Sequence, residues 1–292
     1  MWLFTQSICT GFGDRLGLIL SLSALASLHN GTVWMEWCME PQKAFLANPL
    51  HAQYIPNWRG YDYSLHAVKE HLALPVNVQF FQRQAPALPA VRIEGSAPII
   101  QGIGQTSTLY WKAMKLTDQV WSEREYVQAY QQAGKQTLVR RSAQDPYVLL
   151  HVRAPDENTY FHPAFRTPRQ SFCTRRVVRR LLRQRLYVKV ISNNHTYTSL
   201  LLKGFPSMEV VHQGSYLADL AHVAGAAGIV QQAVEGWSAF SCIPAMALSI
   251  PLLNTYMGED HRYNYFAQYG SIPAEFHACH QLDAFIDRLG LG

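Results

Sequence analysis

One short stretch decides the fold of this chain: Ser7-Ile8-Cys9-Thr10-Gly11-Phe12-Gly13-Asp14-Arg15-Leu16. Residues 2–6 before it are apolar and predict a strand, and residues 16–29 predict a helix that begins near Asp14. Glycines at such a turn let the backbone approach a ligand, and the N–H groups of the helix start attract anions. The third glycine of a dinucleotide fingerprint would fall at Leu16, so this pattern is incomplete and the rest of the chain must supply the partners.

A strand at 32–36 completes a strand–helix–strand unit. Residues 37–105 are rich in proline and aromatic side chains, and we expect irregular loops there, with short helices, that shape an acceptor site. A strand is predicted at 97–101, a helix at 122–134 and a linker at 134–146.

Beyond the linker, apolar strands and helices alternate regularly. We expect strands at 147–153, 186–192, 208–212, 228–231 and 250–255. We expect helices at 175–185, 197–203, 216–224, 237–247 and 282–289. Repeated strand–helix units predict a doubly wound parallel sheet, which binds its ligands at the carboxyl ends of the strands.

Composition indicates a folded globular protein, because 48% of the 292 residues are hydrophobic and only 15% are charged. The formal net charge of +5 favours an anionic ligand or surface and is too small to indicate nucleic acid as a partner. The apolar run 16–28 is shorter than the roughly 20 residues that span a bilayer, and no basic segment precedes it. We therefore expect no signal peptide and no membrane span, and a cytoplasmic location.

The cysteines are odd in number, scattered and without a Cys-x-x-Cys pair: Cys9, Cys38, Cys173, Cys242 and Cys279. This spacing argues against a disulfide framework and a structural zinc site, and favours a reducing compartment. The pair of histidines in His277-Ala278-Cys279-His280 has no second cluster to complete a metal site, so we expect no metal.

Polar side chains follow the apolar strand at 147–153, in the stretch His151-Val152-Arg153-Ala154-Pro155-Asp156-Glu157. In a parallel α/β sheet this is where active sites lie. The planar fork of an arginine matches two phosphate oxygens, so Arg153 is a candidate phosphate ligand. The alternative is a surface cluster of ion pairs.

Three blocks of the chain resemble the GDP-fucose-dependent fucosyltransferases, in the order in which that superfamily has them. Thr10-Gly11-Phe12-Gly13-Asp14 is similar to the opening loop of the rhizobial Nod-factor α-1,6-fucosyltransferases. His151-Val152-Arg153, with Asp156 and His162-Pro163, resembles the mammalian core α-1,6-fucosyltransferases. The stretches 217–222 and 236–241 are similar to the aspartate and Ser/Phe motifs of the superfamily, which includes the protein O-fucosyltransferases.

The resemblance implies a GT-B fold, in which two Rossmann-like α/β domains face each other across a cleft. It implies an N-terminal acceptor-side domain at 1–140, a nucleotide-sugar-binding domain at 146–275 and a C-terminal helix at 276–292 that packs back across the domains. The implied activity is an inverting, metal-independent transfer of a sugar, with L-fucose from GDP-fucose favoured, to a hydroxyl of a glycan or glycoconjugate. Another nucleotide sugar, or a non-catalytic protein that binds one, remains the alternative.

By the same resemblance, Arg153 contacts the leaving phosphate, Asp219 binds the guanine or its ribose, and Asn193 falls at a short polar motif. The residues expected to line the donor are Gly11, Phe12, Gly13, Asp14, Arg15, His151, Arg153, Asn193, Asp219, Ser238, Ala239, Phe240 and Ser241. The core-type enzymes carry a second arginine where this chain has Ala154. The general base is expected to be Glu157, with Asp156 as the second candidate, because a carboxylate must reach the acceptor hydroxyl.

The helix at 175–185 holds much of the positive charge. Arg176, Arg179, Arg180 and Arg183 share one face at helical spacing, with apolar residues opposite. One interpretation is a patch for a membrane surface or an anionic acceptor. The other is a solvated face over a buried apolar stripe.

Overall fold

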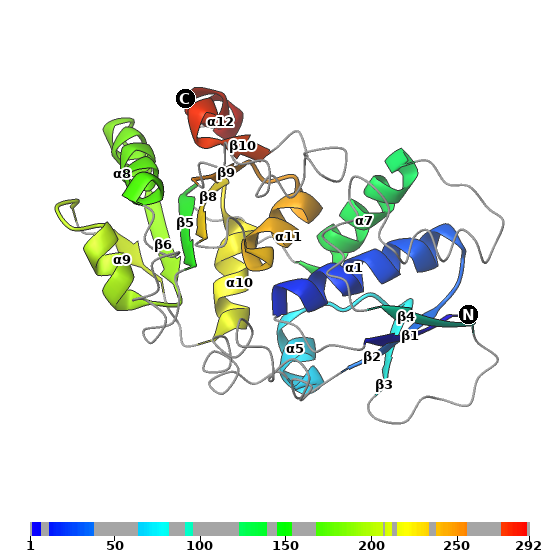
Figure 1. Ribbon diagram of the computed structural model, residues 1–292. Helices are drawn as coiled ribbons and strands as arrows, with labels where there is room; N and C mark the ends of the chain where they lie inside the picture. The colour runs from blue at the N-terminus through cyan, green and yellow to red at the C-terminus, as the bar shows by residue number, and fades with distance from the viewer. Residues whose placement is uncertain are drawn as a thin grey trace. The chain divides into compact units, whose positions relative to one another are not determined.

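The computed structural model describes residues 2–6, 12–37, 64–81, 91–95, 123–138, 145–153, 168–206, 208–211, 215–233, 238–255 and 276–290. These residues form two compact units, and the chain passes from the first to the second between residues 138 and 145. Each unit is an α/β structure built on one parallel sheet (Figure 1).

The first unit has a four-stranded parallel sheet in the order β3-β2-β1-β4. Its strands are β1 (Trp2–Gln6), β2 (Val33–Glu36), β3 (Val78–Phe81) and β4 (Val91–Gly95). Helix α1 (Phe12–Leu28) connects β1 to β2, packs against β2, β3 and α7 (Glu123–Thr137), and is buried along most of its length. That burial follows from its sequence, because a helix that is apolar on all sides is stable only when it is covered.

Two features of this first unit differ from the sequence-based expectation. Helix α1 begins at Phe12, so Phe12 and Gly13 form its first turn, whereas the start was expected near Asp14. The expectation of irregular loops over 37–105 is wrong where β3 and β4 lie, whereas helix α5 (Leu65–His71) is one of the short helices expected there. The two strands are too short to show a hydrophobic period, and Pro75, three residues before β3, is typical of a loop. The strand expected at 97–101 lies outside the described residues.

The second unit has a six-stranded parallel sheet in the order β10-β9-β8-β5-β6-β7. Its strands are β5 (Val148–Arg153), β6 (Val188–Ser192), β7 (Glu209–Val210), β8 (Gly228–Ala233), β9 (Leu252–Asn254) and β10 (Phe276–Ala278). Its helices are α8 (Pro168–Arg183), α9 (His195–Leu201), α10 (Tyr216–Gly225), α11 (Ala239–Leu248) and α12 (Leu282–Leu289). The alternation of strands and helices expected for this half of the chain is confirmed, and β10 is an additional edge strand.

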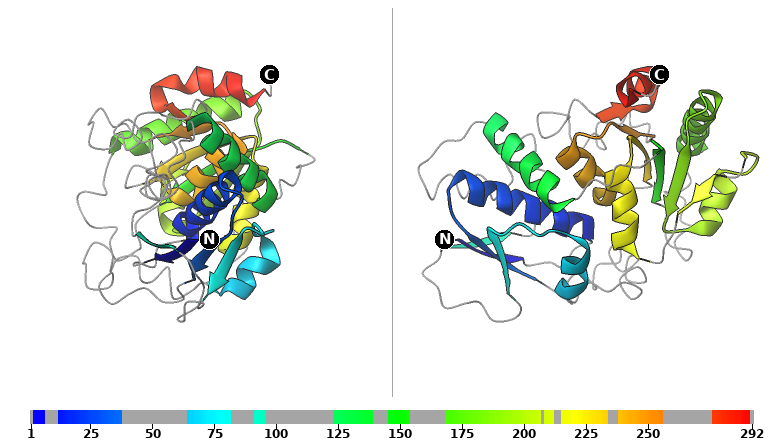
Figure 2. Two further views of the ribbon diagram at one scale, coloured as in Figure 1. Left: turned by 90° about the vertical axis from the view of Figure 1, so that its right-hand side faces the viewer. Right: turned by 180° about the vertical axis from the view of Figure 1, so that it is seen from behind.

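The strand order gives this sheet a reversal point between β5 and β8. From β5 the chain builds outward through β6 and β7, then returns to β8 on the other side and builds outward again. Helices α8 and α9 lie on one face of the sheet, and α10 and α11 lie on the other (Figures 1 and 2). A doubly wound sheet opens a crevice at such a point, because the helices on either side of it leave in opposite directions.

The α8 face of this sheet carries one hydrophobic core cluster of the unit. Val148, Leu150 and Val152 of β5 pack with α8 and with Phe285 and Leu289 of α12, all fully or almost fully buried. Helix α12 approaches the sheet closely at Gly228, where an added Cβ would meet Leu289 and Phe285. The glycine at the start of β8 is therefore what lets α12 pack on the second unit.

The structure corrects the cysteine prediction. Cys173 of α8 and Cys279, in the short 3-10 turn before α12, form a disulfide between residues separated by 106 positions. The prediction that the chain lacks a disulfide is wrong, because two elements far apart in sequence cover the same face of one sheet. In the His277–His280 motif, the sulfur of Cys279 is therefore bonded to Cys173. The ring of His277 packs against Phe285, with centroids 6.0 Å apart.

No helix within the described ranges is both long and apolar enough to cross a bilayer.

Candidate functional site

The carboxyl ends of β5 and β8 hold the group of polar side chains that best marks a site. In the parallel register, His151 lies beside Gln231, and Arg153 lies beside Ala233 at the end of both strands. Side chains alternate along a strand, so His151 and Arg153 share a face, opposite to the one on which Leu150 and Val152 enter the core. That shared face is covered by α11, which begins directly after the β8 loop.

Ser241 of α11 joins the two strands. Its Oγ accepts a hydrogen bond from Gln231 Nε2 at 2.6 Å and lies 2.7 Å from His151 Nδ1. His151 is 5% exposed, and Gln231 and Ser241 are fully buried. The ring of Phe240, the neighbouring residue of the helix, is 5.7 Å from the His151 ring, centroid to centroid. The structure therefore brings together three residues that the sequence predicted as donor ligands: His151, Phe240 and Ser241.

Gln231 is the residue that the sequence analysis missed. Its Nε2 also donates to the backbone carbonyl of Ser238 at 3.0 Å, and its Oε1 accepts from Asn254 Nδ2 at 3.4 Å. Thr255 donates from its backbone N–H and its hydroxyl to the Gln231 carbonyl, at 3.0 and 3.1 Å. A signal was present in the sequence, because Gln231 and Gln232 are adjacent amides in an otherwise apolar strand.

The cluster of His151, Gln231, Ser241 and Cys242 carries no charge, and Arg153 at the end of β5 is the cation next to it in sequence. Burial, and then the positive charge of Arg153, lower the pKa of His151 to about 3, so the imidazole is uncharged at neutral pH. Burial raises the pKa of the Cys242 thiol to about 12, and the protonated thiol faces Gln231 Oε1 at 3.6 Å. A neutral His151 is suited to positioning Ser241 and is not suited to pairing with an anion.

Two groups at this edge suit an anion. Arg153 is half-buried as the last residue of β5. Helix α11 begins at Ala239 with Ser238 as its N-cap, and within the described part of the chain Ser238 makes no capping hydrogen bond through its side chain. The first N–H groups of a helix lack intrahelical partners and carry partial positive charge. The Gln231 amide holds the Ser238 carbonyl, which fixes where this helix starts.

The other predicted ligands of this unit lie at the starts of two helices. Asn194 is the N-cap of α9, and its Oδ1 accepts from Tyr197 N at 2.9 Å, so this residue has a structural role beside the predicted Asn193. Asn193 is half-buried directly after β6. Asp219 lies in the first turn of α10 and is 9% exposed. The roles of Asn193 and Asp219 as donor ligands stay predictions.

On the other face of the sheet edge, Gln232 Nε2 donates to Tyr197 OH at 2.5 Å. The Tyr197 hydroxyl also lies 3.5 Å from Ser171 Oγ of α8. These contacts tie the start of α8 to α9 and β8, which further fixes the strand ends that carry the site.

The remaining predicted residues belong to the first unit or lie outside the description. Arg15 is 1% exposed, and its guanidinium stacks over Trp37 at 5.0 Å from the ring centroid. Phe12 and Gly13 are buried in the first turn of α1, and the backbone of Asp14 follows them. Gly11 and both candidate bases, Asp156 and Glu157, lie outside the described residues, so their roles stay predictions.

The buried neutral state of His151 predicts how stability depends on pH. Its pKa of about 3 in the folded chain lies below the ordinary value near 6.5. Between these values the unfolded chain binds a proton that the folded chain does not, so stability falls as the pH decreases, by up to about 1.4 kcal/mol per pH unit. From pH 7 to 5, urea unfolding should show the wild type losing about 2 kcal/mol more than His151→Gln, which cannot titrate. Parallel curves for the two proteins would contradict a neutral His151.

Comparison with solved structures identifies the class of fold. E. coli heptosyltransferase WaaC with ADP matches over 99% of this chain and 100% of that chain, with a TM-score of 0.52 and 15% identity. The NodZ α-1,6-fucosyltransferase soaked with GDP-fucose matches 86% of this chain and 94% of that one, with a TM-score of 0.41 and 14% identity. A glycosyl transferase family 9 structure from Veillonella parvula matches 94% and 84%, with a TM-score of 0.43 and 9% identity. No protein-family model matches the chain, and no curated protein matches it in sequence.

The fold is therefore α/β of the GT-B type, as expected, with two Rossmann-like units.

Proposed function

We propose that this chain is an inverting, metal-independent glycosyltransferase that moves a sugar from a nucleotide diphosphate donor to a hydroxyl of a glycan or glycoconjugate. The observation that carries the proposal is the cluster at the carboxyl ends of β5 and β8. There Gln231 and Ser241 anchor the start of α11, and Arg153 ends the adjacent strand. A sugar diphosphate needs a fixed cation and N–H donors, and this edge offers both.

The proposed reaction is a single displacement at the anomeric carbon of the sugar. The acceptor oxygen attacks the anomeric carbon while the bond from that carbon to the β-phosphate oxygen breaks. The electron pair of the breaking bond stays on the departing nucleotide diphosphate, and Arg153 with the first N–H groups of α11 stabilises this charge. The acceptor proton passes to a carboxylate, for which Glu157 and then Asp156 remain the candidates.

The favoured donor is GDP-fucose. The three sequence blocks support it, and one of the similar structures is described as a fucosyltransferase soaked with GDP-fucose. A second donor has its own support, because E. coli heptosyltransferase WaaC with ADP matches 99% of this chain and 100% of its own. The second candidate function is therefore transfer of a sugar from an ADP-sugar.

A titration of nucleotides separates these candidates. GDP, GDP-fucose, ADP and UDP are titrated calorimetrically into the full-length protein, and release of free nucleotide is then assayed with and without glycan acceptors. We expect GDP and GDP-fucose to bind at least about tenfold more tightly than UDP, a difference of about 1.4 kcal/mol, because base recognition requires specific polar contacts. Preferential binding of ADP would select the second candidate. Binding without turnover on any acceptor would indicate a non-catalytic protein, and strong inhibition by EDTA would refute metal independence.

A cytoplasmic location is part of the same proposal, and the Cys173–Cys279 disulfide makes the dependence of donor binding on this bond worth measuring. The donor titration is therefore repeated with Cys173→Ala/Cys279→Ala, and unchanged binding would show that the donor site does not need the disulfide.

A further inference from the structure

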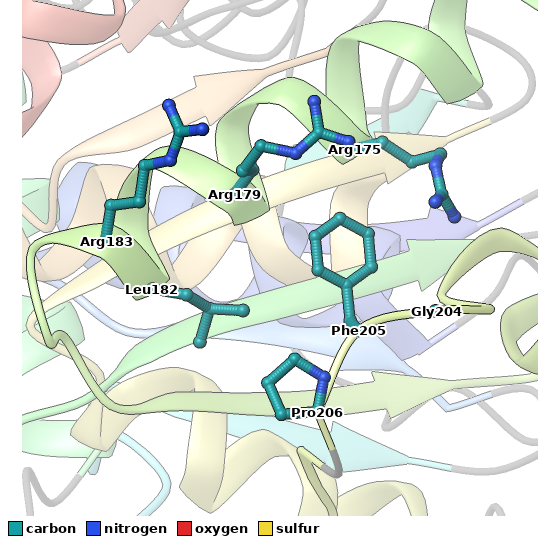
Figure 3. A pocket seen from close by; sticks show the side chains of 7 residues that line it. All are labelled: Arg175, Arg179, Leu182, Arg183, Gly204, Phe205 and Pro206. Carbon is teal, nitrogen blue, oxygen red and sulfur yellow. The ribbon is translucent and has the colours of Figure 1, made fainter.

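A second charged feature of the second unit lies on the α8 face of the sheet, away from the His151 cluster. Arg175, Arg179 and Arg183 follow one another at intervals of four residues, so they form one stripe along α8. Below the stripe, the turn 204–206 after α9 places Phe205 against it (Figure 3). Together with Leu182 these residues line an open pocket of about 300 Å³.

Two of the three arginines, Arg175 and Arg179, have their guanidinium groups over the ring of Phe205. Arg175 donates from Nη1 to the Leu201 carbonyl at 2.6 Å, and its guanidinium lies 4.8 Å from the Phe205 ring centroid. The guanidinium of Arg179 lies 5.9 Å from the same ring. Stacking on an aromatic face holds a guanidinium in place while its N–H groups stay available at the edge.

The described residues that line this pocket include no acidic side chain. Among the described residues Arg179 and Arg183 have no ion-pair partner, whereas Arg180 on the neighbouring side of α8 pairs with Asp283 at 3.5 Å. Like charges four residues apart on a helix repel each other by a few tenths of a kcal/mol per pair, roughly. An anion bound between them would remove this repulsion and would gain charge-assisted hydrogen bonds.

The turn that carries Phe205 depends on the glycine before it. Gly204 has φ +86°, a left-handed conformation that favours glycine, and open space surrounds the place where its Cβ would be. The backbone therefore turns sharply after α9 without filling the pocket. Leu182, Phe205 and Pro206 give the pocket an apolar floor next to the arginines.

We propose that the pocket of Arg175, Arg179, Arg183 and Phe205 binds the phosphate group of a phosphate ester, at a site separate from the donor site. Three guanidinium forks suit the several oxygens of a phosphate. The volume exceeds what a bare ion requires, and the apolar floor suits the organic part of the ester. This inference does not depend on the proposed glycosyl transfer.

The ester has two sources with the same chemistry, a soluble phosphate ester or an anionic lipid headgroup. Phe172 precedes Arg175 by three residues and Arg179 by seven, so it continues the stripe, and it is 67% exposed. An exposed aromatic side chain beside a basic stripe is typical of a helix that lies on a membrane surface. The test therefore needs an arm for each source.

The soluble arm measures glycerol 3-phosphate binding by calorimetry with saturating GDP present, which keeps the donor site occupied. The membrane arm measures sedimentation with vesicles of phosphatidylcholine, with and without phosphatidylglycerol. The test variant is Arg179→Ala/Arg183→Ala. Its matched control is Arg176→Ala/Arg180→Ala, which removes the same charge from the part of the helix surface next to the stripe, outside the pocket lining.

We expect the test variant to weaken binding at least about tenfold, because two charge-assisted contacts are lost, and the control to stay within about threefold. Arg179→Lys/Arg183→Lys should recover only part of the affinity, since lysine keeps the charge and lacks the fork. Phe172→Ser should reduce vesicle binding alone if the ester is a lipid headgroup, and should change neither arm if it is soluble. Equal losses in the test and control variants, or no saturable binding of either probe, would overturn the proposal.

Discussion

Replacing Arg153 with alanine should reduce sugar transfer by about a hundred- to a thousandfold, because removal of a fixed group that stabilises developing charge has effects of that size. Arg153 ends β5 in register with Ala233, the last residue of β8, and the leaving diphosphate is proposed to lie at this sheet edge. The rate should fall mainly through kcat, since the charge on the β-phosphate is greatest in the transition state. The measurement is initial-rate kinetics with GDP-fucose and the best acceptor found in the nucleotide assay.

Two comparisons make this result specific. Arg153→Lys should keep part of the rate, because it retains the charge and loses the bidentate fork. Arg288→Ala in α12 removes an exposed arginine of the same unit and should leave the rate unchanged. The melting temperature should be the same for all three variants within a few degrees, roughly what a change of under 1 kcal/mol produces. Transfer by Arg153→Ala at the wild-type rate would remove this residue from the site.

Opening the Cys173–Cys279 disulfide should lower the free energy of unfolding by about 2–5 kcal/mol, because the bond closes a long loop in the unfolded chain. Both cysteines are buried, at 1% and 9% exposed, so a reductant reaches them only after the region opens and substitution is the better test. Denaturant unfolding of Cys173→Ala, Cys279→Ala and the double variant measures the effect.

The pattern of the three losses identifies its cause. Each single substitution already removes the bond, so the double variant should be only slightly less stable than either single one. Cys242→Ala, which removes a buried cysteine outside the disulfide, serves as the control for lost packing. Fully additive losses, together with no disulfide-linked peptide containing residues 173 and 279 by mass spectrometry, would contradict the bond.

The sequence predicted the second unit better than the first for a physical reason. Strands β5, β6 and β8 are buried, apolar and separated by helices with clear periods, so local pattern and final structure agree. In the first unit β3 and β4 have four and five residues and no helical period between them. Their pairing with β1 and β2 is a tertiary event, which local sequence does not encode.

For the site, the sequence located the strand ends and missed what holds them together. His151, Phe240 and Ser241 were predicted, and they do meet. Gln231 was not, although it and Gln232 are adjacent amides in an apolar strand, because its contacts with Ser241 and the start of α11 appear only in the folded structure. The arginine helix was predicted with both a functional and a structural interpretation. Neither interpretation identified Phe205, which contacts Arg175 from the turn that follows β6 and α9.

The strand order of the second unit also has a consequence for how the chain folds during synthesis. β5 is a central strand of this sheet and the first of its strands to be synthesised, yet its partner β8 follows about 80 residues later. At ribosomal speeds of 5–20 residues per second, β5 waits for β8 for several seconds, roughly. Phe285 and Leu289, which cover Gly228, are made later still. Until then the apolar side chains of β5 and α8 have an incomplete cover, and the emerging chain is open to aggregation. Slowing translation late in the gene should therefore lower the soluble yield more than slowing it early.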